Sequence, residues 1–511
     1  MSSRTKIALH GTVVNIAQYA ILVALQVFVT PLILKNLGQE TLGAYSIVMQ
    51  IVGYSMLLDL GFSVALGRFL SQAFGQPDRK MQFYDIFRIG TLVFLVTNLA
   101  AAIVLVGTAY WADKLVAATE GTADQIRISL YVYAIWLVVR SPLQIYGAGL
   151  IASQNLVAVH LIVLAGTIAR FFGMIVAALI GAGLTSLVFS AIGAELLTFL
   201  LQKRHFSNTL FSVTSGLNDW LQIKVRLLSQ MMFFGLQYFG VRLAQVLTAG
   251  SDALLVGYLF NASQAAVFYT TKMPAFLLVQ FIFKLADNTA PAINELLGCG
   301  EVEKVKLIYY RILRYTLMLA FPLAIGIAAL NFTIISIWVG PGQFAGQIMS
   351  AALSGYVITQ AIAHVDAMIV VASGRMQYWT SLSVFLGLTY LAAAFLLGAY
   401  LGMEWIMVAL FLVDIPGLAF LHHRSSVVLG FTSLDSWRAS VLPALRASVP
   451  IAIVALIPSA IRLQSDFLQV AFFGLLFLMT WLVSSYMLAL LPNERVALRQ
   501  RLASLVQSCG L

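Results

Sequence analysis

The chain has 511 residues, of which 61% are hydrophobic and only 10% are charged. A soluble domain carries about 25% charged residues, so this composition excludes a water-soluble fold and predicts an all-α protein that crosses a membrane many times. The net charge of +10 would suit a nucleic-acid partner, but in a membrane protein it more often reflects basic cytoplasmic loops. We therefore expect no nucleic acid.

Along the chain lie about 14 apolar spans of roughly 20 residues, each long enough to cross the membrane as a helix. The first is too long for a cleavable signal peptide and has no small-residue cleavage site behind it. The approximate ranges are 10–34, 42–66, 87–109, 128–152, 156–180, 183–202, 229–250, 264–287, 312–334, 346–370, 378–400, 404–421, 443–461 and 467–490.

Lysine and arginine set the predicted orientation. With the N-terminus inside, the outer segments hold only Lys35, Lys114, Arg127 and Arg462, and most other basic residues fall in inner segments. This bias predicts that both termini are cytoplasmic and that the number of spans is even. Both cysteines, Cys299 and Cys509, then lie on the cytoplasmic side, where a disulfide is not expected, and no metal motif is visible.

The stretch from Thr30 to Lys80 recurs in weaker form from Leu254 to Lys304. When Tyr45 is aligned with Tyr269, LGQETLGAY falls on NASQAAVFY and QPDRK falls on GEVEK. This repeat indicates a tandem duplication, and the even number of spans before the second copy predicts lobes related by an axis along the membrane normal. We predict an N-lobe at 1–205, a C-lobe at 206–425 that starts with an amphipathic elbow, and two extra spans with a cytoplasmic tail at 426–511.

The turn LGQETLGAY, the following LLDLGFSVALGRF, and APAINELLGCGEVEKVKLIYYRILRYTLMLAFPLAIGIAAL with its later IWVG resemble the polysaccharide-export flippases. These are Wzx-type members of the superfamily that also holds the MATE drug exporters and the lipid II flippase. The resemblance implies two six-helix lobes around a central cavity, in the bacterial cytoplasmic membrane. It also implies alternating access that carries an undecaprenyl-pyrophosphate-linked oligosaccharide (an O-antigen, capsule or exopolysaccharide unit) to the outer leaflet, with a polysaccharide polymerase as a candidate partner.

Cations inside the spans are the first candidates for binding the head group. A charge near mid-membrane costs about 2.5–3.5 kcal/mol, so such residues usually face a cavity or a partner. Arginine in particular matches the paired oxygens of a pyrophosphate. The alternatives are snorkelling for the two residues near predicted inner ends, Arg68 and Lys284, and structural ion pairs for the rest. The complete set is Arg68, Arg140, Arg170, Arg242, Lys272 and Lys284.

Amide side chains at helical spacing predict polar faces that suit sugar hydroxyls, although hydrogen bonds between helices would use the same groups. On the span 128–152, the residues Tyr133, Trp136, Arg140 and Gln144 recur at about one-turn spacing. The amides predicted to line the cavity are Asn15, Gln18, Gln26, Gln237, Gln245 and Gln280.

Carboxylates within spans are candidates for coupling transport to H+ or Na+. We select Asp59, Asp252 and Asp366, with pairing to a cation or a position at a helix end as the alternative, the latter favoured for Asp252. His364 shares a span with Asp366 and could titrate near neutral pH, but such a histidine more often packs. The pair His422–His423 is a weak metal candidate.

Two other functions compete with the flippase. A MATE-like ion-coupled drug or cation antiporter would favour carboxylates over arginines in its cavity. An enzyme of the same pathway would be expected to carry a sizeable extramembrane domain with a catalytic constellation, and no loop is long enough for one. We therefore expect a transporter without a cofactor, with membrane lipid and a lipid-linked oligosaccharide as its partners.

Overall fold

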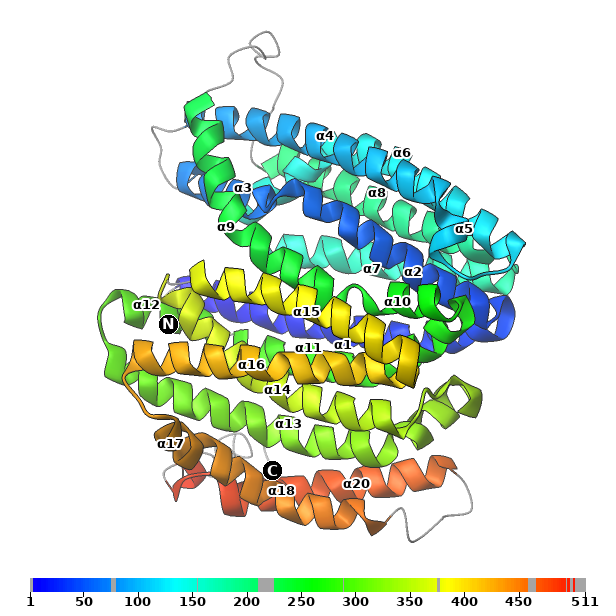
Figure 1. Ribbon diagram of the computed structural model, residues 1–511. Coiled ribbons are helices and arrows are strands. Elements are labelled where there is room, and N and C mark those ends of the chain that lie inside the picture. The colour runs from blue at the N-terminus through cyan, green and yellow to red at the C-terminus, as the bar shows by residue number, and fades with distance from the viewer. Residues whose placement is uncertain are drawn as a thin grey trace, which may run out of the picture. The chain divides into compact units, whose positions relative to one another are not determined.

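The computed structural model describes residues 3–74, 80–153, 155–209, 225–287, 289–374, 377–457, 466–492, 494–496 and 500. Within these ranges every regular element is a helix (Figure 1). Thirteen helical segments are long and apolar enough to cross a membrane, which confirms the predicted all-α polytopic fold. The predicted span 229–250 forms α9 (Val225–Ala249), whose 25 residues are long enough to span but lie outside these thirteen.

Some sequence predictions fall outside the described residues. These are the amphipathic elbow before α9, the tail after residue 500, and Cys509. The other cysteine, Cys299, is exposed.

The chain forms two compact units. Unit 1 comprises residues 1–269 and 377–406, and unit 2 comprises residues 270–376 and 407–511. This division differs from the predicted lobes, because α9, α10 (Asp252–Leu259) and α15 (Gln377–Leu401), all predicted in the C-lobe, belong to unit 1. The lobes predicted at 1–205, 206–425 and 426–511 therefore remain a prediction.

Unit 1 holds the first ten α-helices, the first turns of α11 (Ala262–Asp287), and α15. The ten are α1 (Ser3–Leu37), α2 (Gln39–Ser55), α3 (Phe62–Phe74), α4 (Lys80–Tyr110), α5 (Ala112–Leu115), α6 (Glu120–Ala152), α7 (Leu156–Leu179), α8 (Gly183–Thr209), α9 and α10 (Asp252–Leu259).

A break divides the predicted span 42–66 into α2, the short 3₁₀ helix η1 (Met56–Asp59) and α3. Leu60 and Gly61 adopt left-handed backbone angles, with φ of 51° and 74°. Asp59 stabilises the turn, since its Oδ1 accepts from the Gly61 amide at 2.8 Å and its Oδ2 accepts from Ser63 Oγ at 2.6 Å. A Cβ on Gly61 would lie 2.3 Å from the carbonyl oxygen of Gly235 on α9, so glycine is required here.

Aromatic packing fixes α4, α6 and α8 together. Phe87 of α4 stacks on Phe206 of α8 with ring centroids 5.6 Å apart, and Tyr146 of α6 meets both rings near their edges. Gly149 of α6 makes room for this contact, because a Cβ there would lie 2.6 Å from the Phe206 ring. These three helices carry one of the polar clusters described below.

Unit 2 contains the rest of α11, most of α16 (Glu404–Leu429), and the C-terminal helices. Its longest element, α13, packs along α14 and α18 (Figure 1). The other elements are α12 (Ala290–Gly298), α13 (Val302–Trp338), η4 (Pro341–Gln343), α14 (Gln347–Ala372), α17 (Ser433–Ser436), the π-helix η5 (Trp437–Val441), α18 (Leu442–Ala455), α20 (Asp466–Ser484) and the π-helix η6 (Ser485–Ala489).

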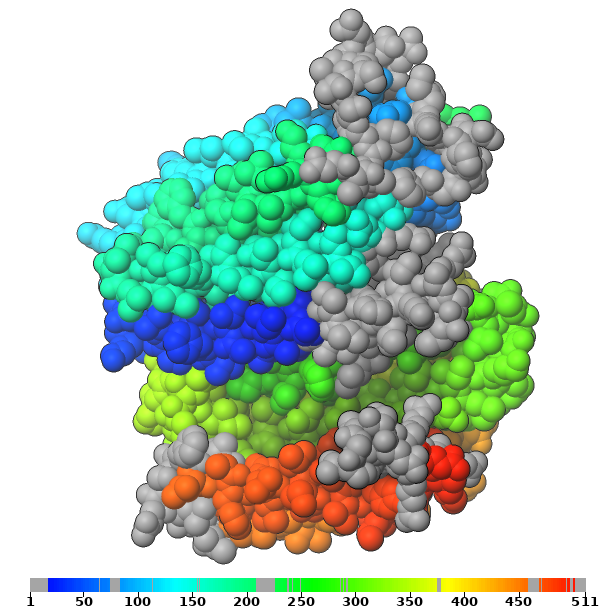
Figure 2. Space-filling view, turned by 180° about the vertical axis from the view of Figure 1, so that it is seen from behind, coloured from blue at the N-terminus to red at the C-terminus, as the bar shows by residue number. Residues whose placement is uncertain are grey.

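Polar contacts attach the C-terminal helices to α13. Trp481 Nε1 donates to the Met318 carbonyl oxygen at 2.7 Å. Arg314, whose side chain is only 5% exposed, donates to Glu494 Oε1 at 2.5 Å and to the Ala439 carbonyl at 3.3 Å. The opposite face of α20 presents exposed apolar side chains, as expected for contact with lipid, and Figure 2 shows this helix uncovered in orange-red.

Glu494→Ala is expected to destabilise the protein by about 3 kcal/mol, because it leaves the buried Arg314 guanidinium without its carboxylate. Arg311→Ala is the matched control. Arg311 lies 3.4 Å from the same carboxylate but is 60% exposed, so its loss should change the stability by less than about 1 kcal/mol. Thermal unfolding in detergent measures both variants, and equal losses would contradict this assignment.

Candidate functional site

The strongest candidate for binding an anion is Arg170 on α7. Its Nη2 donates to the hydroxyl of Tyr45 on α2 at 2.5 Å. Tyr269 also interacts electrostatically with this guanidinium, and its hydroxyl accepts from Gln26 Nε2 on α1 at 2.8 Å. Tyr45 and Tyr269 are the two residues that the sequence repeat places in register, and the fold brings both to one arginine.

The charge of Arg170 has no carboxylate partner in the described part of the chain. Its hydrogen-bond partner is the Tyr45 hydroxyl, and its Nε is buried without any hydrogen bond. A buried donor that lacks an acceptor costs about 1–3 kcal/mol. The guanidinium therefore has a charge that no carboxylate of the described residues neutralises and one N–H group without an acceptor.

Arg140 is in a different position, because it forms an ion pair. Its Nη1 donates to Glu195 Oε2 of α8 at 3.0 Å, and the arginine is 5% exposed. The same carboxylate accepts from Trp136 Nε1 and from the Tyr133 hydroxyl, each at 2.7 Å. One-turn spacing on α6 places these three donors on one face. The Arg140–Glu195 contact is a structural ion pair, which was the alternative considered for Arg140.

Asn98 of α4 completes this cluster. Its Nδ2 donates to Gln144 Oε1 at 2.8 Å, and its Oδ1 lies 3.5 Å from Arg140 Nη2. These contacts link α4, α6 and α8 within unit 1, and Arg140 Nε, like Arg170 Nε, is buried without a hydrogen bond.

Removal of one partner of the Arg140–Glu195 pair should harm the protein more than removal of both. Glu195→Ala leaves a buried cation, which costs about 3–5 kcal/mol, whereas an apolar replacement of the whole pair is often close to neutral. We expect less folded protein in the membrane for Glu195→Ala than for the double variant Arg140→Leu with Glu195→Leu. Size-exclusion chromatography of a fluorescent fusion measures this, and an equal or larger loss in the double variant than in Glu195→Ala would contradict the prediction.

The remaining candidates of unit 1 lie at more open positions. Arg68 is exposed, with its guanidinium 4.3 Å from the centroid of the Phe234 ring. Arg242 and Gln245 are exposed on α9. Gln18 Oε1 lies 3.2 Å from His160 Nδ1. The side chains of Asn15 and Gln237 lie outside the described part of the chain.

In unit 2, α11 carries the other predicted cations. Lys272 is buried, with its Nζ 4.6 Å from the centroid of the Phe276 ring, and that ring stacks on Tyr356 at 5.2 Å. Lys284 is half-buried and Gln280 is exposed. No described contact decides whether these residues meet a substrate, so their role remains a prediction.

Two of the predicted coupling carboxylates lie at helix ends. Asp59 holds the turn before α3, as described above. Asp252 is 1% exposed at the first residue of α10, and its Oδ1 accepts from the Ala253 amide at 2.7 Å and from Gln50 Nε2 at 2.6 Å. These contacts give both carboxylates a structural role, and an additional coupling role is untested.

Asp366 has a different environment, on α14. It is fully buried and accepts from the Tyr309 hydroxyl at 2.7 Å, from Ser425 Oγ at 2.5 Å and from His422 Nδ1 at 3.1 Å. The sequence suggested His422 only as a weak metal candidate. No group of three or more potential ligands that could hold a metal occurs among the residues described. The spacing of His422 and Ser425, one turn apart on α16, was the available signal for their shared partner.

The helices α2 and α11 touch backbone to backbone near their predicted outer ends. A Cβ on Gly43 would lie 1.6 Å from the Ala262 carbonyl oxygen. Gln39 Nε2 donates to the Ser263 carbonyl oxygen at 2.9 Å, and Tyr54 of α2 hydrogen-bonds Ser251 before α10. Within unit 1, α2 therefore packs closely against the start of α11 and against Ser251.

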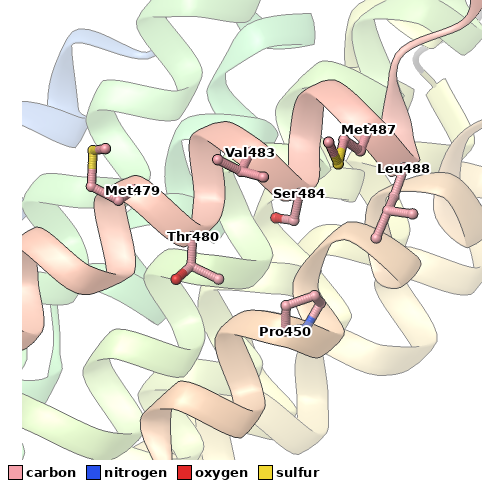
Figure 3. Close-up of a pocket in the computed structure, with 7 residues that line it drawn as sticks. All are labelled: Pro450, Met479, Thr480, Val483, Ser484, Met487 and Leu488. Carbon is pink, nitrogen blue, oxygen red and sulfur yellow. The ribbon is translucent and has the colours of Figure 1, made fainter.

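Unit 2 also has an apolar hollow of about 420 Å³ on the C-terminal helices (Figure 3). Its lining carries no charged side chain, so it does not suit a charged head group. The lining residues are Pro450, Met479, Thr480, Val483, Ser484, Met487 and Leu488.

Comparisons with known proteins agree with the resemblance drawn from the sequence. The family model described as polysaccharide biosynthesis protein matches residues 37–342. The uncharacterized membrane protein EpsK of Bacillus subtilis (strain 168) is 21% identical over 340 residues, and the match covers 64% of this chain and 64% of EpsK. The chain therefore aligns with somewhat less than two thirds of that relative.

Two solved structures show the same fold. The lipid II flippase MurJ, in an inward closed conformation, has a TM-score of 0.67 at 15% identity, over 93% of this chain and 98% of that one. An inward-facing MATE family multidrug resistance transporter of the MOP superfamily has a TM-score of 0.65 at 12% identity, over 83% of this chain and all of the other. At these identities the likeness concerns the fold alone.

Proposed function

Because the chain belongs to the polysaccharide biosynthesis protein family, we propose that it is a flippase for an undecaprenyl-pyrophosphate-linked oligosaccharide. It carries this lipid from the inner to the outer leaflet of the bacterial cytoplasmic membrane, with both termini in the cytoplasm. Its partners are the lipid-linked substrate, membrane lipid, a coupling ion and a polysaccharide polymerase.

The observation that carries this proposal is the un-neutralised guanidinium of Arg170. A pyrophosphate presents paired anionic oxygens, which an arginine fork binds through two parallel charge-assisted hydrogen bonds. Arg140 is less suited to this task, because Glu195 already neutralises it. We therefore assign the main head-group contact to Arg170, and auxiliary contacts to Arg242, Lys272, Lys284 and Arg68.

The close contact of α2 with α11 supports alternating access. Substrate release to the outer leaflet requires a path between the two repeats, and Gly43 and Ala262 belong to corresponding parts of those repeats. The contact must therefore open during transport and close again before the next substrate enters. A glycine such as Gly43 suits a contact of this kind, because the absence of a side chain lets two backbones approach closely.

The deciding experiment uses cells whose own flippase gene is deleted and which carry this chain on a plasmid. Restored surface polysaccharide, with disappearance of the accumulated lipid-linked repeat unit, is the expected result. A gain of resistance to cationic drugs without restored export would instead assign the chain as a MATE-like antiporter. Release or joining of sugars by the purified protein would reveal an enzyme.

A further inference from the structure

Counting spans within each predicted lobe, the third, fourth and sixth helices are α4, α6 and α8 in the N-lobe and α13, α14 and α16 in the C-lobe. In each set one carboxylate accepts several hydrogen bonds. Glu195 of α8 accepts from three residues of α6, and Asp366 of α14 accepts from residues of α13 and α16. Each predicted lobe therefore contains a carboxylate that joins helices, although the two carboxylates lie on different helices of their sets.

The two carboxylates differ in their cationic partner. Arg140 is protonated at every physiological pH, so its pair with Glu195 is permanent. His422, the partner of Asp366, belongs to the side-chain type whose charge ordinarily changes between about pH 5 and 8. The charge of the Arg140–Glu195 pair is therefore constant over this pH range, whereas the charge of the His422–Asp366 pair changes with pH.

The two members of the second pair differ in exposure. Asp366 and Tyr309 are fully buried, while 21% of the His422 side chain is exposed. Tyr309 follows Val302, the first residue of α13, by seven residues, and His422 precedes Leu429, the last residue of α16, by seven. At 1.5 Å per residue the pair lies about 10 Å from the predicted cytoplasmic ends. His422 is therefore the member of the pair that is placed to exchange a proton.

From these observations we propose that His422 and Asp366 form a proton-binding site that holds the inner ends of α13, α14 and α16 together. Water supplies one proton to Nε2 of His422, and Nδ1–H continues to donate to Asp366. The resulting imidazolium neutralises the buried carboxylate. Loss of that proton leaves a buried anion with neutral donors only, which destabilises the closed packing of the three helix ends. The proton is thereby the coupling ion, an inference that rests on the proposed flippase function.

Other titratable groups on the surrounding helices make separate contacts or are exposed. Lys306 of α13 donates to the Gly430 carbonyl at 3.2 Å and lies 3.7 Å from Glu303. His364 of α14 contacts Asp287 of α11 at 2.8 Å and stacks on Phe283. Further groups on the packed helices are Asp414, which accepts from Gln360, Arg424, which lies over the Phe420 ring, His423, and the exposed Glu295 of α12.

The sign of the pH effect follows from the charge of the pair. The ion pair between His422 and Asp366 stabilises the folded protein at a pH where His422 is protonated. This stabilisation is lost as the pH rises and His422 loses its proton. One linked proton changes the equilibrium constant of unfolding by up to about tenfold per pH unit in that window. The melting temperature of the purified full chain in detergent should therefore fall between pH 5.5 and pH 8.

The test compares the melting profiles of wild type, His422→Gln and His364→Gln over this pH range. His364→Gln is the matched control, because its carboxylate partner Asp287 is 51% exposed, so this pair adds little to the stability and its loss should keep the wild-type slope. His422→Gln should flatten the profile, and His422→Lys, with a permanent charge, should flatten it at higher stability. A His422→Gln profile that is lowered but keeps its slope would show a merely structural role and overturn the proposal.

Two further measurements separate this inference from the flippase assignment. Asp366→Asn keeps the size of the side chain but has no charge to neutralise, so its melting profile should also lose its slope. A wild-type profile that responds to Na+ and not to pH would replace the proton by sodium and overturn the proposal. The melting measurements need no substrate, so a flat His422→Gln profile supports the proton site even if the export assay is negative. A negative melting test, in turn, does not affect the conclusion from the export assay.

Discussion

Replacement of Arg170 by alanine is expected to reduce export of the lipid-linked oligosaccharide by roughly a hundredfold while the protein remains inserted. A charge-assisted hydrogen bond contributes about 1.5–3 kcal/mol, so the loss of two such bonds to a pyrophosphate costs at least about 3 kcal/mol, which corresponds to this factor. The measurement is surface polysaccharide in flippase-deficient cells, together with the amount of lipid-linked repeat unit retained in the inner leaflet.

Two variants make the Arg170 result specific. Arg170→Lys keeps the charge but loses the planar fork, so its export should lie between those of wild type and alanine. Arg127→Ala removes an arginine from the same unit that pairs with Asp124 at 2.7 Å, and should leave export unchanged. Wild-type export by Arg170→Ala would show that this guanidinium does not bind the head group.

The contrast between Arg170 and Arg140 shows how far the sequence could predict the site. Both are arginines within apolar spans, and from the sequence alone they were equally strong candidates. What separates them is Glu195, which follows Arg140 by 55 residues and reaches it through the packing of α6 on α8. Helical spacing did predict that Tyr133, Trp136 and Arg140 share a face, because that depends only on the period of the helix.

The fold was more predictable than the contacts between helices. Apolar length determines the spans, because lipid leaves the backbone no other hydrogen-bond partner. The break at Leu60 and Gly61 was not predicted, since it arises from Asp59 and from the approach of Gly235, a residue far along the chain. Asp366 shows the same limit, because its partners lie 56 to 59 residues away in the chain.

Substitution of Gly43 by valine is expected to hold the outer ends of α2 and α11 apart and to abolish export. A Cβ at Gly43 would lie 1.6 Å from a backbone oxygen, so no side-chain movement can relieve the clash. Overpacking of this kind costs about 1–3 kcal/mol or more. A cost of about 3 kcal/mol would shift the balance between closed and open outer ends by roughly a hundredfold.

The opening can be measured with a cysteine at Gln39, which lies beside this contact, after Cys299 and Cys509 are replaced by serine. A thiol reagent that cannot cross the membrane should label this cysteine from outside much faster in the Gly43→Val variant than in its parent. Gly53→Val is the matched control, because it lies on the same helix and a Cβ there meets no atom within 4 Å. Equal labelling rates with and without Gly43→Val would show that this contact does not close the outer side. Faster labelling with normal export would show that transport does not need its closure.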